Sequence, residues 1–136
     1  MGRRLVLDTG VLVAAERGRI DLTQIALDDD ICVTMITVAE LMTGVAMARP
    51  EQRERMRRFV DGVLSIVPAL PYNEDIVDAH ATLLSWTLSH GRPWGQHDLM
   101  IAATALVTGR TLLTMDRKAR FDQLPGLSVE LLADAA

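Results

Sequence analysis

The sequence predicts an α/β sandwich in which a central, mainly parallel sheet is flanked by helices. The first observation is the alternation of short apolar runs with longer segments of helical periodicity. Runs rich in Leu, Val and Ile are typical of strands buried on both faces, as in a parallel sheet. The second is that most neighbouring runs are separated by enough residues for a helical crossover. The sequence has no internal repeat or linker, so we expect residues 1–136 to form one domain.

The predicted strands are short and apolar. The first ends at Asp8, after the run Leu5-Val6-Leu7. The strand expected over residues 31–35 precedes Thr37, and the strand expected over residues 111–115 ends at Asp116. Both strands are therefore followed by polar residues. Strands are expected over residues 4–8, 31–35, 66–70, 111–115 and 128–132.

The predicted helices are bounded by helix-stopping residues. Pro50 ends one segment, Gly91 follows another, and Gly109 closes a strongly apolar one. Helices are expected over residues 11–17, 21–27, 37–48, 51–65, 73–89 and 97–108, with one or two further turns in 117–123.

Composition and charge limit the possible functions. The net charge of −4 argues against a scaffold that grips nucleic acid by basic charge alone, so an acidic protein acting on RNA would need cations. The single cysteine, Cys32, lies in an apolar run and predicts a buried thiol. No apolar run approaches the length of a membrane span, and the stretch before Asp8 is too short for a signal peptide. We therefore expect a cytoplasmic protein.

Four acidic residues fall where predicted elements meet one edge of the sheet. Asp8 and Asp116 follow strands directly, whereas Glu40 and Asp98 lie near the starts of helices. In an open parallel sheet the ligand site lies beyond the carboxyl ends of the strands. The placement therefore predicts that all four carboxylates converge there.

Converging carboxylates indicate a metal site. Without a cation they would repel one another and raise at least one pKa. Oxygen ligands favour Mg²⁺ or Mn²⁺ over Zn²⁺, which usually recruits His or Cys. Such an ion can activate water and neutralise charge on a phosphodiester, so the sequence predicts metal-dependent hydrolysis of a phosphodiester without a protein nucleophile.

Each acid also has a purely structural interpretation. Asp8 could cap the following helix, and Glu40 could complete a T-x-x-E capping box with Thr37. Asp98 would be favoured by the dipole in any helix's first turn, and Asp116 is an ordinary turn residue. The joint placement of the four carries the functional interpretation.

The motifs that hold these acids resemble those of a known family. They are Leu5-Val6-Leu7-Asp8-Thr9, Thr37-Val38-Ala39-Glu40-Leu41, Asp98-Leu99-Met100-Ile101-Ala102-Ala103-Thr104-Ala105 and Leu112-Leu113-Thr114-Met115-Asp116. The chain resembles PIN-domain proteins and, more closely, the VapC toxins of bacterial toxin–antitoxin pairs, over essentially its whole length.

This resemblance implies a PIN-like three-layer sandwich and an endoribonuclease that depends on Mg²⁺ or Mn²⁺. It also implies a homodimer and a cognate antitoxin that blocks the acidic pocket. By motif match, Asp8, Glu40, Asp98 and Asp116 take the catalytic and metal-binding roles. Thr9, in the first motif, is a candidate for a supporting role. Thr114 stands where the family commonly has a small hydroxyl residue, although a strand threonine can equally satisfy local backbone.

Basic and aromatic residues near the acids are candidates for RNA contacts. Arg117 and Lys118 follow Asp116 directly, where they could hold phosphates or simply be solvated. Arg92 and Trp94 lie in the loop before Asp98, where the tryptophan could stack on a base or pack on a helix. His97 could assist proton transfer, although a lone histidine at a helix start is more often a cap.

Two other functions compete with the ribonuclease. Leu7-Asp8-Thr9-Gly10 is similar to the catalytic turn of aspartic proteases, but that fold would need strands almost throughout. The second alternative is a catalytically weak PIN-like module that binds metal or a partner without cutting RNA. Metal-dependent cleavage abolished by Asp8→Asn would separate the module from the enzyme.

Overall fold

The computed structural model describes residues 2–133. Within this range every strand pairing is parallel, and the strands lie in the order β3-β2-β1-β4-β5. The strands are β1 (Arg4–Leu7), β2 (Asp30–Thr34), β3 (Ala69–Leu70), β4 (Thr111–Thr114) and β5 (Val129–Leu131). β1 occupies the centre and pairs with both β2 and β4, which makes the first and fourth strands neighbours. The predicted parallel sheet is confirmed.

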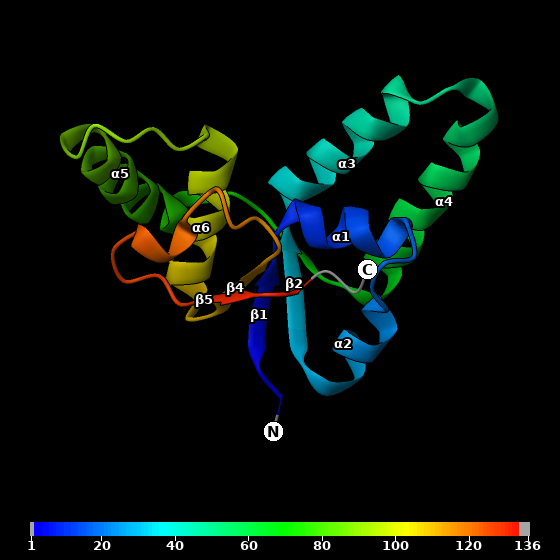
Figure 1. The fold of residues 1–136 in the computed structure, drawn as a ribbon, viewed down its shortest axis with the longest axis horizontal. Coiled ribbons are helices and arrows are strands. Elements are labelled where there is room, and N and C mark those ends of the chain that lie inside the picture. Colours follow the sequence, from blue (N-terminus) through cyan, green and yellow to red (C-terminus); the bar gives the residue numbers. More distant parts are fainter. Residues whose placement is uncertain (1, 134–136) are drawn as a thin grey trace.

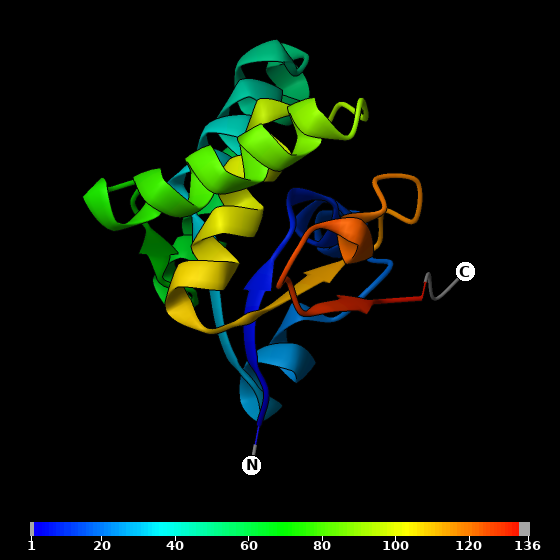
Figure 2. The same ribbon diagram turned by 90° about the vertical axis from the view of Figure 1, so that its left-hand side faces the viewer.

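Helices cover both faces of the sheet and complete a three-layer sandwich. On one side of the strands are α1 (Thr9–Glu16), α2 (Leu22–Asp28), α3 (Met35–Met47) and α4 (Pro50–Ile66) (Figure 1). On the other side are α5 (Glu74–Ser89) and α6 (Gln96–Thr108), which cross the sheet as a pair when the molecule is turned (Figure 2). A short 3₁₀ turn, η1 (Phe121–Gln123), precedes β5.

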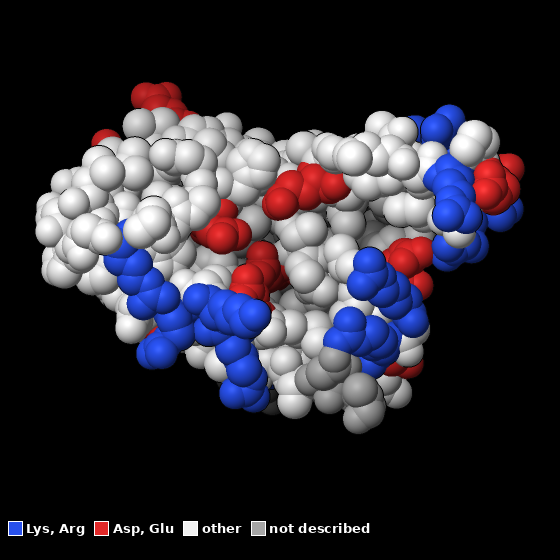
Figure 3. Space-filling model, turned by 45° about the horizontal axis from the view of Figure 1, so that its top comes forward, with Lys and Arg blue, Asp and Glu red and all other residues white. Residues whose placement is uncertain are grey.

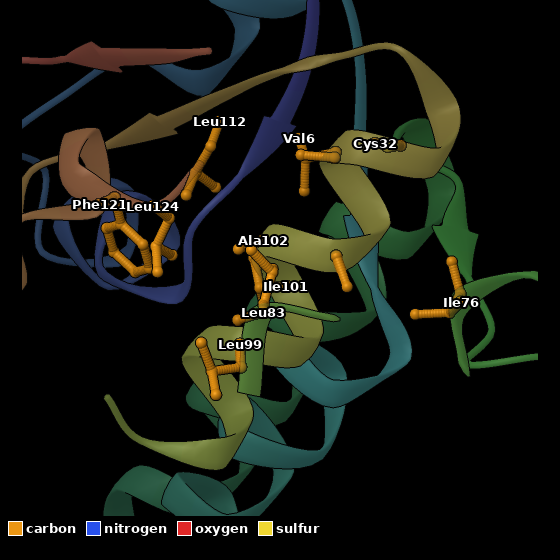
Figure 4. Packing of buried hydrophobic residues seen from close by; sticks show 12 residues of the cluster. Val6, Cys32, Ile76, Leu83, Leu99, Ile101, Ala102, Leu112, Phe121 and Leu124 are labelled. Atoms are coloured by element: carbon orange, nitrogen blue, oxygen red, sulfur yellow. The ribbon is translucent and has the colours of Figure 1, made fainter. Parts of the chain in front are cut away.

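The alternation of strand side chains divides the core between the two faces. Val6 and Leu112 belong to the buried cluster on the side of α5 and α6, together with Leu83 and Leu99 (Figure 4). Leu5 and Leu113 belong to the opposite cluster, with residues of α1, α2 and α4. Because successive strand residues face opposite ways, runs of consecutive apolar residues such as Leu5-Val6-Leu7 pack against both helical layers.

Several predicted boundaries differ from the structure. The helix predicted to begin at Thr37 begins at Met35, because the hydroxyl of Thr34 accepts the hydrogen of the Thr37 amide and caps it. The strand predicted over 66–70 is reduced to Ala69–Leu70, since α4 continues to Ile66. The turns predicted in 117–123 are reduced to η1.

Cys32 is buried, as predicted, and its thiol has a raised pKa because of desolvation. Among residues 2–133, no helix combines the length and the apolar character that crossing a membrane requires. The predicted domain over 1–136 includes Met1 and residues 134–136, which lie outside the described residues.

Candidate active site at the carboxyl edge of the sheet

The carboxyl ends of the central strands open onto a hollow that contains acidic side chains. Asp8 follows β1, and Asp116 lies two residues beyond the end of the neighbouring β4. Viewed from this end, acidic residues gather in the middle of the face, between the lobe of α5 and α6 and the α3–α4 hairpin (Figure 3). Lys and Arg residues lie on both sides of them.

Asp8 is the most buried of the four acids. It is the N-cap of α1, where its Oδ1 accepts a hydrogen bond from the Thr9 amide at 2.9 Å. Desolvation raises the pKa of its carboxyl, the hydrogen bonds from Thr114 and Thr9 oppose the rise, and the charges of Asp116 and Glu40 add to it. Asp8 therefore caps a helix, and the negative charges of two of the other acids also raise its pKa.

Thr114 connects Asp8 to Asp116. Its fully buried hydroxyl donates to Asp8 Oδ2 at 2.8 Å and accepts from the Asp116 amide at 3.0 Å. Asp116 is exposed, and its Oδ1 accepts from the amides of Lys118 and Ala119, both at 3.0 Å. Thr114, predicted to have a supporting role, thus contacts both acids. Asp116 also stabilises the turn that follows it by accepting hydrogen bonds from two of its amides.

Glu40 does not form the capping box that its spacing to Thr37 suggested. Thr34 caps α3, and Glu40 lies in the second turn of the helix. Its Oε1 accepts a hydrogen bond from the hydroxyl of Thr9 at 2.9 Å. The alternative structural interpretation of Glu40 was wrong because α3 begins at Met35, which puts Thr37 inside the helix and not at its N-cap.

Asp98 has the most perturbed of the four carboxyl groups. It lies in the first turn of α6 and is partly buried. Desolvation, followed by the charges of Asp8, Asp116 and Glu40, raises the pKa of Asp98 to about 6, and His97 opposes the rise. The like-charge effect requires all three other acids to lie within electrostatic reach of Asp98.

His97 is not the helix cap that was considered for it. Gly95 occupies the N-cap position of α6, and no side chain caps this helix. The exposed His97 ring instead lies at the site, with Nδ1 3.9 Å from Glu40 Oε2. Glu40, His97 and Asp98 also line one open pocket of about 420 Å³.

The oxygen atoms that the four acids offer are the kind of ligand that a hard divalent cation prefers. All four acids offer carboxylate oxygens, and no cysteine is among the pocket residues. Across residues 2–133, however, no three His, Cys, Asp or Glu side chains already stand close enough together to hold a metal ion. Mutual repulsion of the carboxylates opposes such a cluster, and a bound cation would relieve it.

One of the two basic candidates after Asp116 borders a second pocket. Arg117 and Lys118 are exposed, and Arg117 lines a pocket of about 370 Å³ together with Thr114, Asp116 and Arg120. Arg120 is paired with Asp122, which lines the same pocket. Cationic side chains thus adjoin the acidic hollow, where a phosphodiester chain could approach it.

Arg92 and Trp94 lie beside each other in the loop before α6. The Arg92 guanidinium is over the Trp94 ring, 4.8 Å from its centroid, and also donates to Gln123. Trp94 is partly buried against the core and lies near Trp86. The ring is therefore packed, as the structural alternative expected, and Arg92 covers one of its faces.

Sequence reasoning missed the functional context of Thr34 and Thr37. Both hydroxyls are buried, and Thr37 lies 3.0 Å from the Thr9 hydroxyl that bonds Glu40. The T-x-x-E spacing was a signal for this relationship but was assigned to a helix cap.

The α/β architecture, with helices between parallel strands, also excludes the aspartic protease interpretation of Leu7-Asp8-Thr9-Gly10.

Comparison with known proteins agrees with this architecture and extends it. Ribonuclease VapC1 of Rickettsia felis is 31% identical over 126 residues, which cover 92% of this chain and 93% of that protein. The crystal structure of VapBC2 from Rickettsia felis, bound to a DNA fragment from its promoter, contains a chain with 25% identity. It superposes with a TM-score of 0.86 and covers 95% of this chain and 98% of that one.

A second solved structure, VapBC-5 from Mycobacterium tuberculosis, is described as a member of the VapBC family of toxin–antitoxin systems. Its matching chain is 29% identical with a TM-score of 0.74, over 96% of this chain and 98% of that one. The PIN domain family itself matches residues 5–127, which include all four acidic motifs. This chain belongs to the PIN domain family.

Proposed function

We propose that this protein is an endoribonuclease that hydrolyses RNA phosphodiester bonds with the help of Mg²⁺ or Mn²⁺. We further propose that it is the toxin of a toxin–antitoxin pair and that a cognate antitoxin inhibits it. The observation that carries the proposal is the arrangement of the four carboxylates at the carboxyl edge of the sheet, where the Thr114 hydroxyl bonds both Asp8 and Asp116, and Glu40 and Asp98 line one pocket. The ribonuclease relative and the toxin–antitoxin structures support the choice of RNA and of an antitoxin.

The metal site proposed here uses Asp8, Glu40, Asp98 and Asp116. When bound, the ion would activate a water molecule and neutralise charge on the phosphate. Thr114 holds Asp8 and Asp116 in a fixed relation, since its one hydroxyl bonds both residues. Asp8 is held further by its bond to the Thr9 amide, so both of its carboxylate oxygens have a hydrogen-bond partner that fixes their orientation.

RNA would reach the carboxylates along the basic border of the hollow. Arg117 and Lys118 are the candidates for phosphate contacts because they are exposed and directly follow Asp116. Arg92 and Trp94 are weaker candidates, since each already has a partner within the protein. The net charge of −4 makes these local cations, together with the metal, the main attraction for a polyanion.

The remaining parts of the proposal concern assembly and location. We propose that the protein forms a homodimer and acts in the cytoplasm, where an RNA substrate is available. Light scattering on the purified protein would measure its mass against 15.0 kDa for one chain. A mass of one chain at micromolar concentration would contradict the homodimer without affecting the ribonuclease assignment.

The function is tested by incubating the purified protein with total RNA in Mg²⁺, Mn²⁺ or EDTA and mapping the cut ends. We expect defined cleavage with either ion, none in EDTA, and none with Asp116→Asn. Asp61→Asn is the matched control, because Asp61 is an exposed acid of α4 that pairs with Arg57 outside the hollow. Metal binding without cleavage by the wild type would instead favour the catalytically weak binding module.

A further inference from the structure

Three threonine hydroxyls form a line that leads from the protein interior to Glu40. Thr34 ends β2, Thr37 lies in the first turn of α3, and Thr9 begins α1. The Oγ1 atoms of Thr34 and Thr37 are 3.4 Å apart, and those of Thr37 and Thr9 are 3.0 Å apart. The Thr9 hydroxyl then lies 2.9 Å from Glu40 Oε1.

The hydrogen bonds in this line can point in only one direction while Glu40 is ionised. A carboxylate can only accept, so the single hydroxyl hydrogen of Thr9 is used on Glu40. Thr9 must therefore accept from Thr37, and Thr37 in turn accepts from Thr34. Each hydroxyl has one hydrogen, and each hydrogen is committed toward the carboxylate.

The inner end of the line is buried and fixed. Thr37 and Thr34 are almost completely shielded from solvent, so water does not compete for their hydroxyls. Thr34 Oγ1 also accepts from the Thr37 amide at 3.1 Å, which fixes its position as the cap of α3. Hydrogen bonds in such a chain polarise one another and restrict the rotamers of their members.

We propose that Thr37 is a positioning residue that acts through Thr9 on the orientation of Glu40. Its hydroxyl holds the Thr9 hydroxyl toward Oε1, which leaves Oε2 on the side of His97, 3.9 Å from Nδ1, and of the acidic hollow. The line thereby ties one carboxylate oxygen to the protein and presents the other for a cation. This inference rests on the proposed function, because it assigns Glu40 to the metal site.

The test compares Thr37→Val, which keeps the shape of the side chain but removes the hydroxyl, with Thr37→Ser, which keeps the hydroxyl. Thr87→Val is the matched control, since Thr87 is also buried and its hydroxyl donates to the Leu84 carbonyl within α5. Mn²⁺ affinity is measured by electron paramagnetic resonance on RNA-free protein, with melting temperature and the kcat and KM of RNA cleavage measured alongside.

We expect Thr37→Val to weaken Mn²⁺ binding by about tenfold or more, the range found when a partner of a metal ligand is removed. It should lower kcat at low Mn²⁺ while leaving the KM for RNA unchanged. Thr37→Ser should restore affinity to near the wild-type value, and Thr87→Val should bind Mn²⁺ as the wild type does.

Two results would overturn the positioning role while leaving the proposed function intact. In one, Thr37→Val melts at a lower temperature but binds Mn²⁺ normally, so that its hydroxyl serves stability alone. In the other, Thr37→Ser and Thr37→Val lose affinity equally, which would assign the effect to packing. A wild-type protein that neither binds Mn²⁺ nor cleaves RNA would overturn both proposals together.

Discussion

At the residue scale, the site concentrates charge that the fold alone would not favour. Asp98 is partly buried and lies within electrostatic reach of three other acids, and burial first, then their charges, raise its pKa to about 6 from an ordinary 3.8. Such placement destabilises the folded protein wherever Asp98 is ionised. Functional sites commonly retain arrangements of this kind at a cost to stability.

The raised pKa of Asp98 predicts a stability that depends on pH in metal-free protein. A carboxyl group whose pKa is higher in the folded state favours folding below pH 3.8, and this contribution is lost as the pH rises through about 6. Asp98→Asn removes the charge, so with EDTA it should melt at a higher temperature than the wild type at pH 7.5. The difference should shrink at pH 4.5.

Differential scanning calorimetry at the two pH values would measure this effect. Equal differences at both values would contradict an electrostatic origin and indicate a change in packing. The same variant should lose Mn²⁺ binding, because it removes one of the four proposed ligands. Stability and metal affinity are therefore expected to change in opposite directions.

At the element scale, helix starts and strand ends position the acids. Asp8 caps α1, and Asp98 lies in the first turn of α6, so each carboxylate is near amide hydrogens or a positive helix end. Asp116 is held by the amides of the turn after β4. These local contacts favour a carboxylate at each place, but at Asp8 and Asp98 burial and the other acids outweigh them, because both pKa values are raised.

The double role of Asp8 can be separated by two substitutions. Asp8→Asn retains an oxygen that accepts from the Thr9 amide, whereas Asp8→Ala removes the cap. We expect Asp8→Ala to be about 1 kcal/mol less stable than Asp8→Asn in urea unfolding. Both variants should lose RNA cleavage. Cleavage by Asp8→Asn at the wild-type rate would show that Asp8 serves the helix alone.

Sequence pattern was sufficient to place Asp8 and Asp116 at one edge of the sheet, but not to identify the hydrogen-bond partner of Glu40. Asp8 and Asp116 could be placed because each follows a recognisable strand, and parallel strands share one carboxyl edge. The partner of Glu40 could not be predicted, because Thr9 is 31 residues away in the sequence. Thr37, at capping-box spacing from Glu40, suggested a helix cap instead. The pattern describes neighbours along the chain, whereas the hydrogen bond depends on how α1 and α3 pack.

At the scale of the whole molecule, the acidic hollow lies between two helical lobes and has basic residues at its sides (Figure 3). The protein as a whole is acidic, with a net charge of −4. Attraction to RNA must then come from local cations and from the bound metal. The affinity of the protein for RNA should consequently depend on a small number of contacts between basic side chains and phosphates.

This arrangement predicts a modest salt dependence that a small number of residues carry. Arg117→Gln and Lys118→Gln should each weaken RNA binding and lower the slope of log K against log salt by about 0.7, the value for one single-strand phosphate contact. Fluorescence anisotropy with Asp116→Asn as the non-cleaving background would measure the slope. Arg4→Gln is the control, because Arg4 lies at the opposite end of β1 and pairs with Asp30.

An unchanged slope in both variants would remove Arg117 and Lys118 from the RNA-binding surface. A slope that falls equally in Arg4→Gln would point instead to the overall charge of the protein. Either result would leave the carboxylate site and its metal chemistry unaffected, since these residues were not chosen as ligands.

The sequence by itself determined the layered parallel fold, the central apolar strands and the four acidic positions. It could do so because periodicity and strand-end placement are local properties that packing preserves. The tertiary structure decided which hydroxyl bonds each acid, that Trp94 packs under Arg92, and how strongly Asp98 is perturbed. Those outcomes depend on distances between segments far apart in the chain, and only the packing of helices on the sheet sets them.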